Sequence, residues 1–350
     1  MSIIESSVIS NKAACSLPGT ADELAAAGHL LAAITRGTEE NLLKHDAALE
    51  RRLVQWRHQA FQQLAPSTPR QDWPPVIDDV LAGQPSPPEV AGSQLNCSSL
   101  TAGIQHHGSL IVRELITPEQ VARLVEGIDR AFSDSASQGG TYVELESTPW
   151  YSRFPLPPEN FISVCRPWVE CAGGVLLADS PRMTSEFAKL LEEIQLLPVI
   201  EGYLGERPTL SIAKTTLRRV PKTLRMTGWH QDGYFLGEGI RSVNLWLCLS
   251  HCGENASGLD VIPKRFNHLV ETGTHGAALD WVVGDAMVDM VSNDAPVVSP
   301  VFRPGDAMLF DELLLHRTGI PKQMLHDRYA IESWFFAPSS YPMAQEPLLV

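Results

Sequence analysis

The sequence Trp229-His230-Gln231-Asp232-Gly233 places an imidazole and a carboxylate on either side of one residue. In an extended strand, residues i and i+2 point to the same face, so His230 and Asp232 can reach a single metal ion. The pattern alone is weak evidence, because the chain contains 11 histidines and 41 acidic residues. Its meaning depends on the residues that follow it along the chain.

A second histidine and an arginine follow in a suggestive order. His316 ends the apolar run Leu313-Leu314-Leu315, and Arg328 precedes an apolar strand that runs to Phe336. Two imidazoles and one carboxylate are the facial triad of a mononuclear non-haem iron(II) site, with adjacent positions left open for a bidentate 2-oxo acid and dioxygen. A structural zinc site would instead fill its shell with four protein ligands.

Five blocks that contain these residues occur in a fixed order, and they are found at residues 229–233, 243–249, 254–263, 304–306 and 328–331. Together they resemble the phytanoyl-CoA dioxygenase family of iron(II)- and 2-oxoglutarate-dependent oxygenases. The resemblance extends from about Leu100 to about Pro338. It implies a mainly β fold with flanking helices, built on a double-stranded β-helix, which is a cupin-like jelly-roll of two facing sheets.

The resemblance also implies roles for individual residues. His230, Asp232 and His316 would be the iron ligands, Arg328 would bind the distal carboxylate of 2-oxoglutarate, and Trp246 would line the co-substrate pocket. Alternatively, Arg328 forms an ion pair at the surface, and Trp246 is an ordinary residue of the hydrophobic core. The carboxylate of Asp232 favours oxygenation, since related halogenases replace it with a small residue.

Four further residues are weaker candidates. Alternation over residues 208–220 predicts a strand beside the one that carries His230, with Thr215 and Arg219 on one inward face that lines the co-substrate or substrate pocket. Gln231 and Arg153 are substrate candidates. Arg153 belongs to residues 141–181, an aromatic and proline-rich segment without clear period, which is either a substrate wall over the iron or a structural excursion.

Composition restricts the class of protein and its partners. The net charge of −14, without a basic run, argues against nucleic acid and anionic membranes as partners. The resemblance implies a small-molecule substrate instead. The six cysteines lack the CxxC spacing of a zinc site. The first residues have no basic start before an apolar run, and no stretch of apolar residues is long enough to span a membrane, so we expect a cytoplasmic protein.

Three regions are expected along the chain. Residues 1–98 form a helical extension with a proline-rich connector, residues 99–340 the oxygenase domain, and residues 341–350 a tail. In the extension, apolar spacing predicts one helix around residues 24–34 and a second over residues 42–64. Their apolar faces either cap the barrel or pair with a second copy in a homodimer. A strand is predicted at residues 103–112, with a helix starting at Pro118.

The expected activity is oxidation of an unactivated C–H bond with iron(II), 2-oxoglutarate and dioxygen. Hydroxylation is the default outcome, while desaturation, cyclisation and epimerisation stay open. Residues 264–268 and 320–321 depart from the family pattern, which leaves the substrate undetermined. The alternatives are a cupin-like metal-binding protein or hydrolase on the same ligands, and a catalytically silent assembly module. Arg328 discriminates between them, because neither alternative requires a buried carboxylate clamp.

Overall fold

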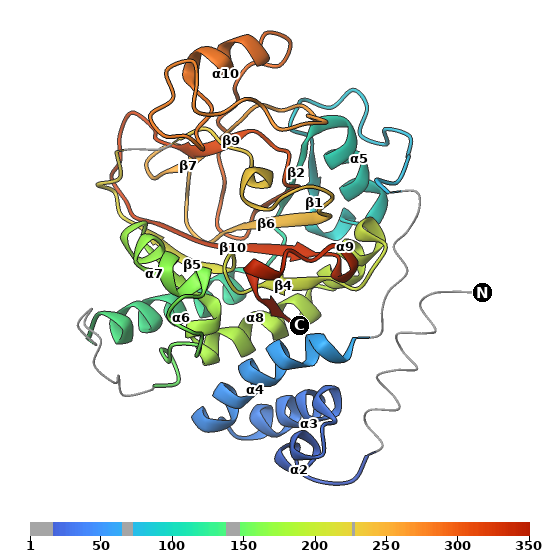
Figure 1. Ribbon diagram of the computed structural model, residues 1–350. Coiled ribbons are helices and arrows are strands. Elements are labelled where there is room, and N and C mark those ends of the chain that lie inside the picture. Colours follow the sequence, from blue (N-terminus) through green and yellow to red (C-terminus); the bar gives the residue numbers. More distant parts are fainter. Residues whose placement is uncertain (1–16, 65–72, 138–147, 226–227) are drawn as a thin grey trace.

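A nine-stranded mixed sheet lies at the centre of the computed structural model, which describes residues 17–64, 73–137, 148–225 and 228–350 (Figure 1). The main path runs β1-β2-β8-β6-β10-β4-β11, and β5 also pairs with β10 and carries β3 at its other edge. The strands are β1 (Glu89–Ala91), β2 (Ser109–Arg113), β3 (Gly174–Leu176), β4 (Thr209–Ser211), β5 (Thr216–Val220), β6 (Ser242–Cys248), β8 (Ala307–Phe310), β10 (Arg328–Phe336) and β11 (Pro347–Leu348).

β10 is the strand around which this sheet is organised. One edge pairs with β6 from Ala330 to Phe336, and the other pairs first with β5 and then with β4. Because side chains alternate along a strand, Ile331 and Phe335 point to the helical side, where they join the largest apolar cluster. Arg328, Glu332 and Trp334 have the opposite parity and face the other way.

A small second sheet lies opposite that inward face. It consists of β7 (Gly258–Val261) and β9 (His316–Gly319), and isolated bridges join His230 to His316 and Val261 to Val298. A compact apolar cluster fills the space between the two sheets, with Trp246, Met308 and Ala330 from the large sheet and Leu259 and Val261 from the small one. The two sheets therefore face each other as two layers, with this apolar cluster packed between them.

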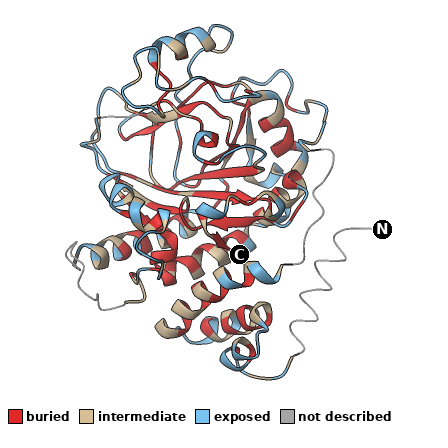
Figure 2. Ribbon diagram, in the orientation of Figure 1, coloured by how far each residue is buried: buried red, intermediate tan, exposed pale blue. Residues whose placement is uncertain are grey.

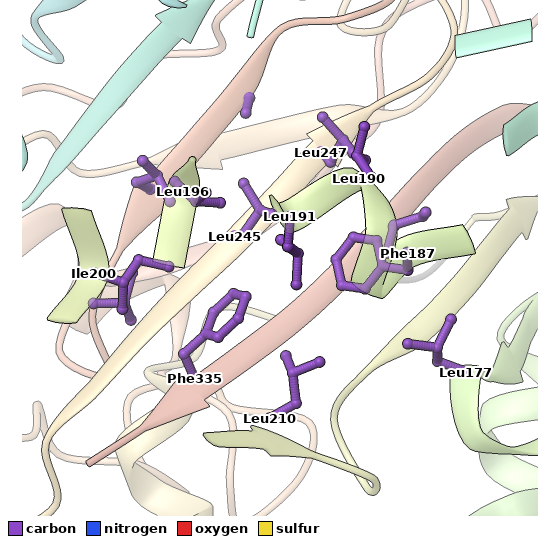
Figure 3. Packing of buried hydrophobic residues seen from close by; sticks show 14 of the residues in the cluster. Leu177, Phe187, Leu190, Leu191, Leu196, Ile200, Leu210, Leu245, Leu247 and Phe335 are labelled. Atoms are coloured by element: carbon purple, nitrogen blue, oxygen red, sulfur yellow. The ribbon is translucent and has the colours of Figure 1, made fainter. Parts of the chain in front are cut away.

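Helices cover the other face of the large sheet. They are α5 (Cys97–His107), α6 (Pro118–Ser137), α7 (Phe161–Cys171), α8 (Pro181–Glu193) and α9 (Leu196–Leu204), while α10 (Asp285–Val291) lies beyond the small sheet (Figure 1). Figure 3 shows Phe187, Leu191 and Ile200 of α8 and α9 packed against Leu245 and Phe335 of the sheet. The sheet and the helices beneath it are largely buried, whereas α10 is mostly exposed (Figure 2).

The structure corrects the predicted fold class and also bears on whether a helix could span a membrane. Helices account for 39% of the described residues and strands for 18%, so the class is a mixed sheet with flanking helices rather than mainly β. Within the described ranges, no helix is both long enough and apolar enough to cross a membrane.

The N-terminal helices begin and end at different residues than predicted. The structure has α2 (Ala21–Ala26), α3 (Leu30–Leu43) and α4 (Ala47–Gln59). Gly28 adopts a positive φ between α2 and α3, and Asp46 caps α4 by accepting a hydrogen bond from the Leu49 N–H at 2.8 Å. The predicted first helix is therefore interrupted, and Leu42 and Leu43 end α3 instead of starting the next helix.

Two other segment predictions were wrong in part. Residues 103–107 belong to α5 and not to a strand, because the helix ends at Gly108, whose φ of 79° is the left-handed C-terminal signal. The segment 141–181 was expected to be irregular, yet it contains α7 and β3, and α7 includes Pro167. Residues 138–147 lie outside the described ranges. The helix start at Pro118 is confirmed.

The extension is joined to the sheet's helical layer through a buried ion pair. Glu50 of α4 is fully buried, contacts Arg182 of α8, and accepts a hydrogen bond from Asn41 Nδ2 at 3.1 Å. At the other end of α4, Arg57 Nη1 donates to the carbonyl of Leu349 at 3.1 Å. The extension thus contacts both α8 and the C-terminal residues.

Glu50→Ala should destabilise the protein strongly, because it leaves the Arg182 guanidinium without its buried partner. We expect the free energy of unfolding to fall by roughly 3 kcal/mol in chemical denaturation. Glu159→Ala, at an exposed position, is the matched control and should change it by less than about 0.5 kcal/mol. A loss below about 1 kcal/mol for Glu50→Ala would show that this pair does not hold the extension in place.

Candidate functional site

Three side chains converge at the edge between the two sheets. His230, Asp232 and His316 each offer one ligand atom, and these atoms lie within 4.8 Å of one another. His230 Nε2 is 3.7 Å from Asp232 Oδ1, and the two imidazole centroids are 4.5 Å apart. Within the part of the chain that the structure describes, these are the three His, Cys, Asp or Glu side chains that lie close enough together to hold a metal ion. Its donor set is the one that non-haem iron(II) prefers.

Backbone pairing positions the two histidines. The N–H of His230 donates to the carbonyl of His316 at 2.9 Å, and the N–H of His316 donates to His230 at 3.0 Å. Each ring is then oriented by its own loop: His230 Nδ1 lies 2.9 Å from the Gly228 carbonyl, and His316 Nδ1 lies 3.0 Å from the Leu314 carbonyl. A carbonyl accepts only from a protonated Nδ1, so both Nε2 atoms are left free to bind a metal.

The carboxylate ligand is also supported. Asp232 begins a short 3-10 helix (Asp232–Phe235), and Asn244 Nδ2 of β6 donates to its Oδ2 at 3.1 Å. The next residue, Gly233, donates its N–H to the Glu312 carbonyl at 2.9 Å. A Cβ added at Gly233 would lie 3.2 Å from that carbonyl oxygen, so the close approach favours glycine. Asn244 was not among the sequence candidates.

The environment keeps one histidine in its metal-binding form. Burial, followed by the nearby charge of His316, lowers the pKa of His230 to about 4. Desolvation disfavours the charged imidazolium, so this ring is neutral at neutral pH. A neutral imidazole is what metal coordination requires, and no proton has to be displaced from it.

Arg328 lies on the inward face of β10 and is only 2% exposed. Its Nη2 is 3.4 Å from Glu332 Oε1 and its Nη1 donates to the Gly258 carbonyl at 3.3 Å, while Nε has no hydrogen bond with any described residue. The guanidinium lies 5.5 Å from the Trp246 ring centroid, and the Trp246 indole N–H is also without a described partner. Two neighbouring residues therefore each carry a buried donor without a described acceptor.

Arg218 is a functional candidate that sequence reasoning missed. Its Nε donates to Glu332 Oε2 at 2.8 Å, so it shares this carboxylate with Arg328. Arg219 was predicted to face inward, but it lies on the opposite face, where Nη1 contacts Asp129 Oδ1 of α6 at 3.1 Å. The predicted strand is interrupted between β4 and β5, which reverses the expected parity. β5 pairs with β10 and β3, not with the segment that carries His230.

The remaining sequence candidates have other partners. Gln231 Nε2 donates to the carbonyls of His268 and Leu313, and its Oε1 accepts from the Val270 N–H. Its side chain is thus committed to joining loops and is not available to a substrate. Thr215 is buried and its hydroxyl has no described partner, so its role stays a prediction.

The predicted substrate wall carries two arginines with partners of their own. Arg153 lies 3.5 Å from Glu170 and donates to the Tyr151 hydroxyl at 3.2 Å. Arg166 is buried against Asp179, with Nε 2.8 Å from Oδ2. Arg166 is therefore a structural residue, while ligand-dependent ordering of this segment stays a prediction.

A buried acidic pair lies behind the loop that carries His316. Asp311 contacts Arg265, and Glu312 Oε2 accepts a hydrogen bond from Ser242 Oγ at 2.7 Å. Burial, and then the charge of Asp311, raises the pKa of Glu312 to about 8. Glu312 consequently holds its proton in the folded protein at neutral pH, where an unfolded chain would release it.

Comparisons with known proteins give a family match and similar folds. The family model described as Phytanoyl-CoA dioxygenase (PhyH) matches residues 104–320. No curated protein sequence matches the chain. The apoform of EctD from S. alaskensis is 18% identical with a TM-score of 0.50, and the match covers 81% of this chain and 88% of that one. At this identity the likeness shows the fold alone.

Two more distant structures are bound forms. EctD from S. alaskensis with 2-oxoglutarate and 5-hydroxyectoine is 18% identical, covering 79% of this chain and 88% of that one at a TM-score of 0.49. The epimerase SnoN in complex with Fe3+, alpha ketoglutarate and nogalamycin RO is 14% identical, covering 69% and 83% at 0.45.

Glu312→Gln should make stability less sensitive to alkaline pH. Between the unfolded pKa of 4.5 and the folded value of about 8, folding takes up a proton at Glu312, so this contribution to stability declines as pH rises. Glutamine keeps the hydrogen-bonding shape without titrating. We expect Glu312→Gln to gain more than about 1 kcal/mol relative to wild type between about pH 5 and pH 8, measured by urea unfolding. An equal difference at both pH values would contradict the raised pKa.

Proposed function

The chain belongs to the phytanoyl-CoA dioxygenase family, and we propose from this premise that it oxidises an unactivated C–H bond of a small molecule, by default through hydroxylation. Its activity class is that of an iron(II)- and 2-oxoglutarate-dependent oxygenase, an oxidoreductase. The observation that carries the proposal is the cluster of His230, Asp232 and His316, with its ligand atoms within 4.8 Å of one another. Three protein ligands leave room for a bidentate co-substrate and dioxygen.

The residues present fit both cofactors. Both imidazoles present a free Nε2, and the carboxylate of Asp232 is oriented by Asn244. When bound, iron(II) and 2-oxoglutarate supply the activation of dioxygen, with 2-oxoglutarate converted to succinate and carbon dioxide. The protein's part is to hold the ligands in place, to orient the substrate and to keep water out.

We assign the distal carboxylate of 2-oxoglutarate to Arg328. Its Nε and the Trp246 indole N–H are buried donors without a described acceptor. A planar guanidinium can donate two parallel hydrogen bonds to one carboxylate. Arg218 adds a second positive charge against the single carboxylate of Glu332. An anionic co-substrate compensates this excess. A zinc hydrolase or a silent assembly module has no use for such a buried clamp, which favours the oxygenase.

The expected β-helix core, domain boundaries, role of the extension and location remain proposals. The two facing sheets support a double-stranded β-helix, with residues 99–340 as its domain, 1–98 as an extension and 341–350 as a tail. Packing of α4 on α8 supports capping by the extension, and a homodimer through these helices is the other possibility. A cytoplasmic location remains the expectation from the sequence.

Asp232→Ala and His316→Ala should each abolish iron binding and turnover while the fold is kept. Each variant removes one of three ligands, so iron stoichiometry after anaerobic loading should fall towards zero, with unchanged far-UV circular dichroism. His268→Ala, which alters an exposed histidine on a neighbouring loop, is the control and should retain iron. If either variant retained stoichiometric iron and activity, the substituted residue would not be an iron ligand.

Arg328→Lys should raise the 2-oxoglutarate requirement by at least about tenfold, because a point charge replaces a two-bond fork. Iron affinity should change little. Arg303→Lys, at an exposed position, is the control. Succinate formation measured against 2-oxoglutarate concentration provides the test, and an unchanged KM for 2-oxoglutarate would remove Arg328 from the site.

A further inference from the structure

Lys214 is a largely enclosed cation near the triad, and it has no described counter-ion. It lies between β4 and β5, where its backbone N–H donates to Ser211 Oγ at 3.0 Å. Its Nζ lies 4.9 Å from the Phe235 ring centroid and 4.8 Å from that of Trp334. Over residues 17–64, 73–137, 148–225 and 228–350, no ion pair or hydrogen bond involves this ammonium group.

Arg57 of α4 is buried and donates to the Leu349 carbonyl, whereas five other enclosed arginines among the described residues have carboxylate partners. They are Arg166 with Asp179, Arg182 with Glu50, Arg218 and Arg328 with Glu332, and Arg265 with Asp311. Burial lowers the pKa of Lys214, and the charges that act on it come from Asp232, Arg218, Glu332 and Cys165. Two aromatic faces offset part of the desolvation cost through cation–π attraction, but they do not replace an anion.

An aromatic surface connects this lysine to the metal ligands. Phe235 lies 5.8 Å from Trp281 between ring centroids, and Trp281 lies 5.9 Å from the ring of His230. Tyr234 and Phe235, two and three residues after Asp232, remain 43% and 37% exposed. Exposed aromatic rings beside a catalytic centre, with one cation among them, are the composition of a ligand-binding surface.

We propose that Lys214 binds an anionic group, of the carboxylate class, on the organic substrate, while Phe235 and Trp281 contact the substrate's apolar body. This inference rests on the proposed function, because it places the substrate's C–H bonds on the His230 side of the metal site. The substrate class is therefore a small amphiphilic acid, with its charge at one end and an apolar portion towards the iron ligands.

A carboxylate on Lys214 could also come from 2-oxoglutarate, but position favours the substrate. Arg328 and Arg218 meet at Glu332, near the start of β10, whereas Lys214 contacts Trp334 further along the strand. At about 3.3 Å per residue, the Cα atoms of Arg328 and Trp334 are roughly 20 Å apart, so Lys214 approaches the inward face at a different point from Arg328. The two cationic sites thus lie towards opposite ends of the inward face.

The test uses the full chain loaded anaerobically with iron(II) and 2-oxoglutarate, whose visible absorption band reports on nearby binding. Hexanoate and 3-phenylpropanoate are titrated, each against its primary amide. Wild type should bind at least one acid about tenfold more tightly than its amide. Lys214→Met should lose this preference, Lys214→Arg should keep it, and Lys222→Met, at an exposed lysine nearby, should behave as wild type.

The Kd of 2-oxoglutarate, taken from the same band, separates the two sources of the carboxylate. In Lys214→Met it should stay within about twofold of wild type. A tenfold weaker 2-oxoglutarate with an unchanged acid preference would overturn the proposal, as would equal or absent binding of acids and amides by wild type. Absence of the band from wild type would contradict the proposed function itself, and the assignment of Lys214 would fall with it.

Discussion

The reciprocal backbone pair between His230 and His316 is the interaction on which the site depends. It joins two segments far apart in the sequence at 2.9 and 3.0 Å, and it brings both imidazoles to one point. Side-chain contacts then refine the arrangement, since each Nδ1 is held by a carbonyl of its own loop and Asp232 by Asn244. Gln231 contributes from between the two ligands by fastening the loops around them. These contacts hold the three side chains in the arrangement that the proposed metal site requires.

β10 supplies further residues on the inward face of the large sheet, beside the three side chains of the candidate metal site. Its outward residues, such as Ile331 and Phe335, hold the sheet against the helices, and its inward residues carry Arg328, Glu332 and Trp334. One strand thus serves both stability and chemistry through alternation alone. The charges on the inward face are uneven, because Arg328, Arg218 and Lys214 outnumber Glu332, and we propose that anionic ligands compensate for that imbalance.

Sequence motifs pointed to the candidate residues whose type and order are distinctive. They did not predict on which face of a strand a side chain lies, because that depends on the register of the strand. The triad and Arg328 were accessible because ordered motifs surround them. Arg219 was placed inward instead of Arg218, because a break before Thr216 shifts the strand by one residue and one residue reverses every side chain. Lys214 gave no signal, since Phe235 and Trp334 approach it only in three dimensions. α7 escaped prediction because it includes Pro167, which ordinarily interrupts a helix.

Anaerobic titration of the metal-free chain with iron(II), followed by 2-oxoglutarate, tests whether His230, Asp232 and His316 form an iron site that accepts the co-substrate. We expect one iron per chain and a visible absorption band that appears only when 2-oxoglutarate is added, because the co-substrate would bind the metal in the positions left open by three protein ligands. Binding of iron at another stoichiometry, or a spectrum that 2-oxoglutarate leaves unchanged, would contradict it.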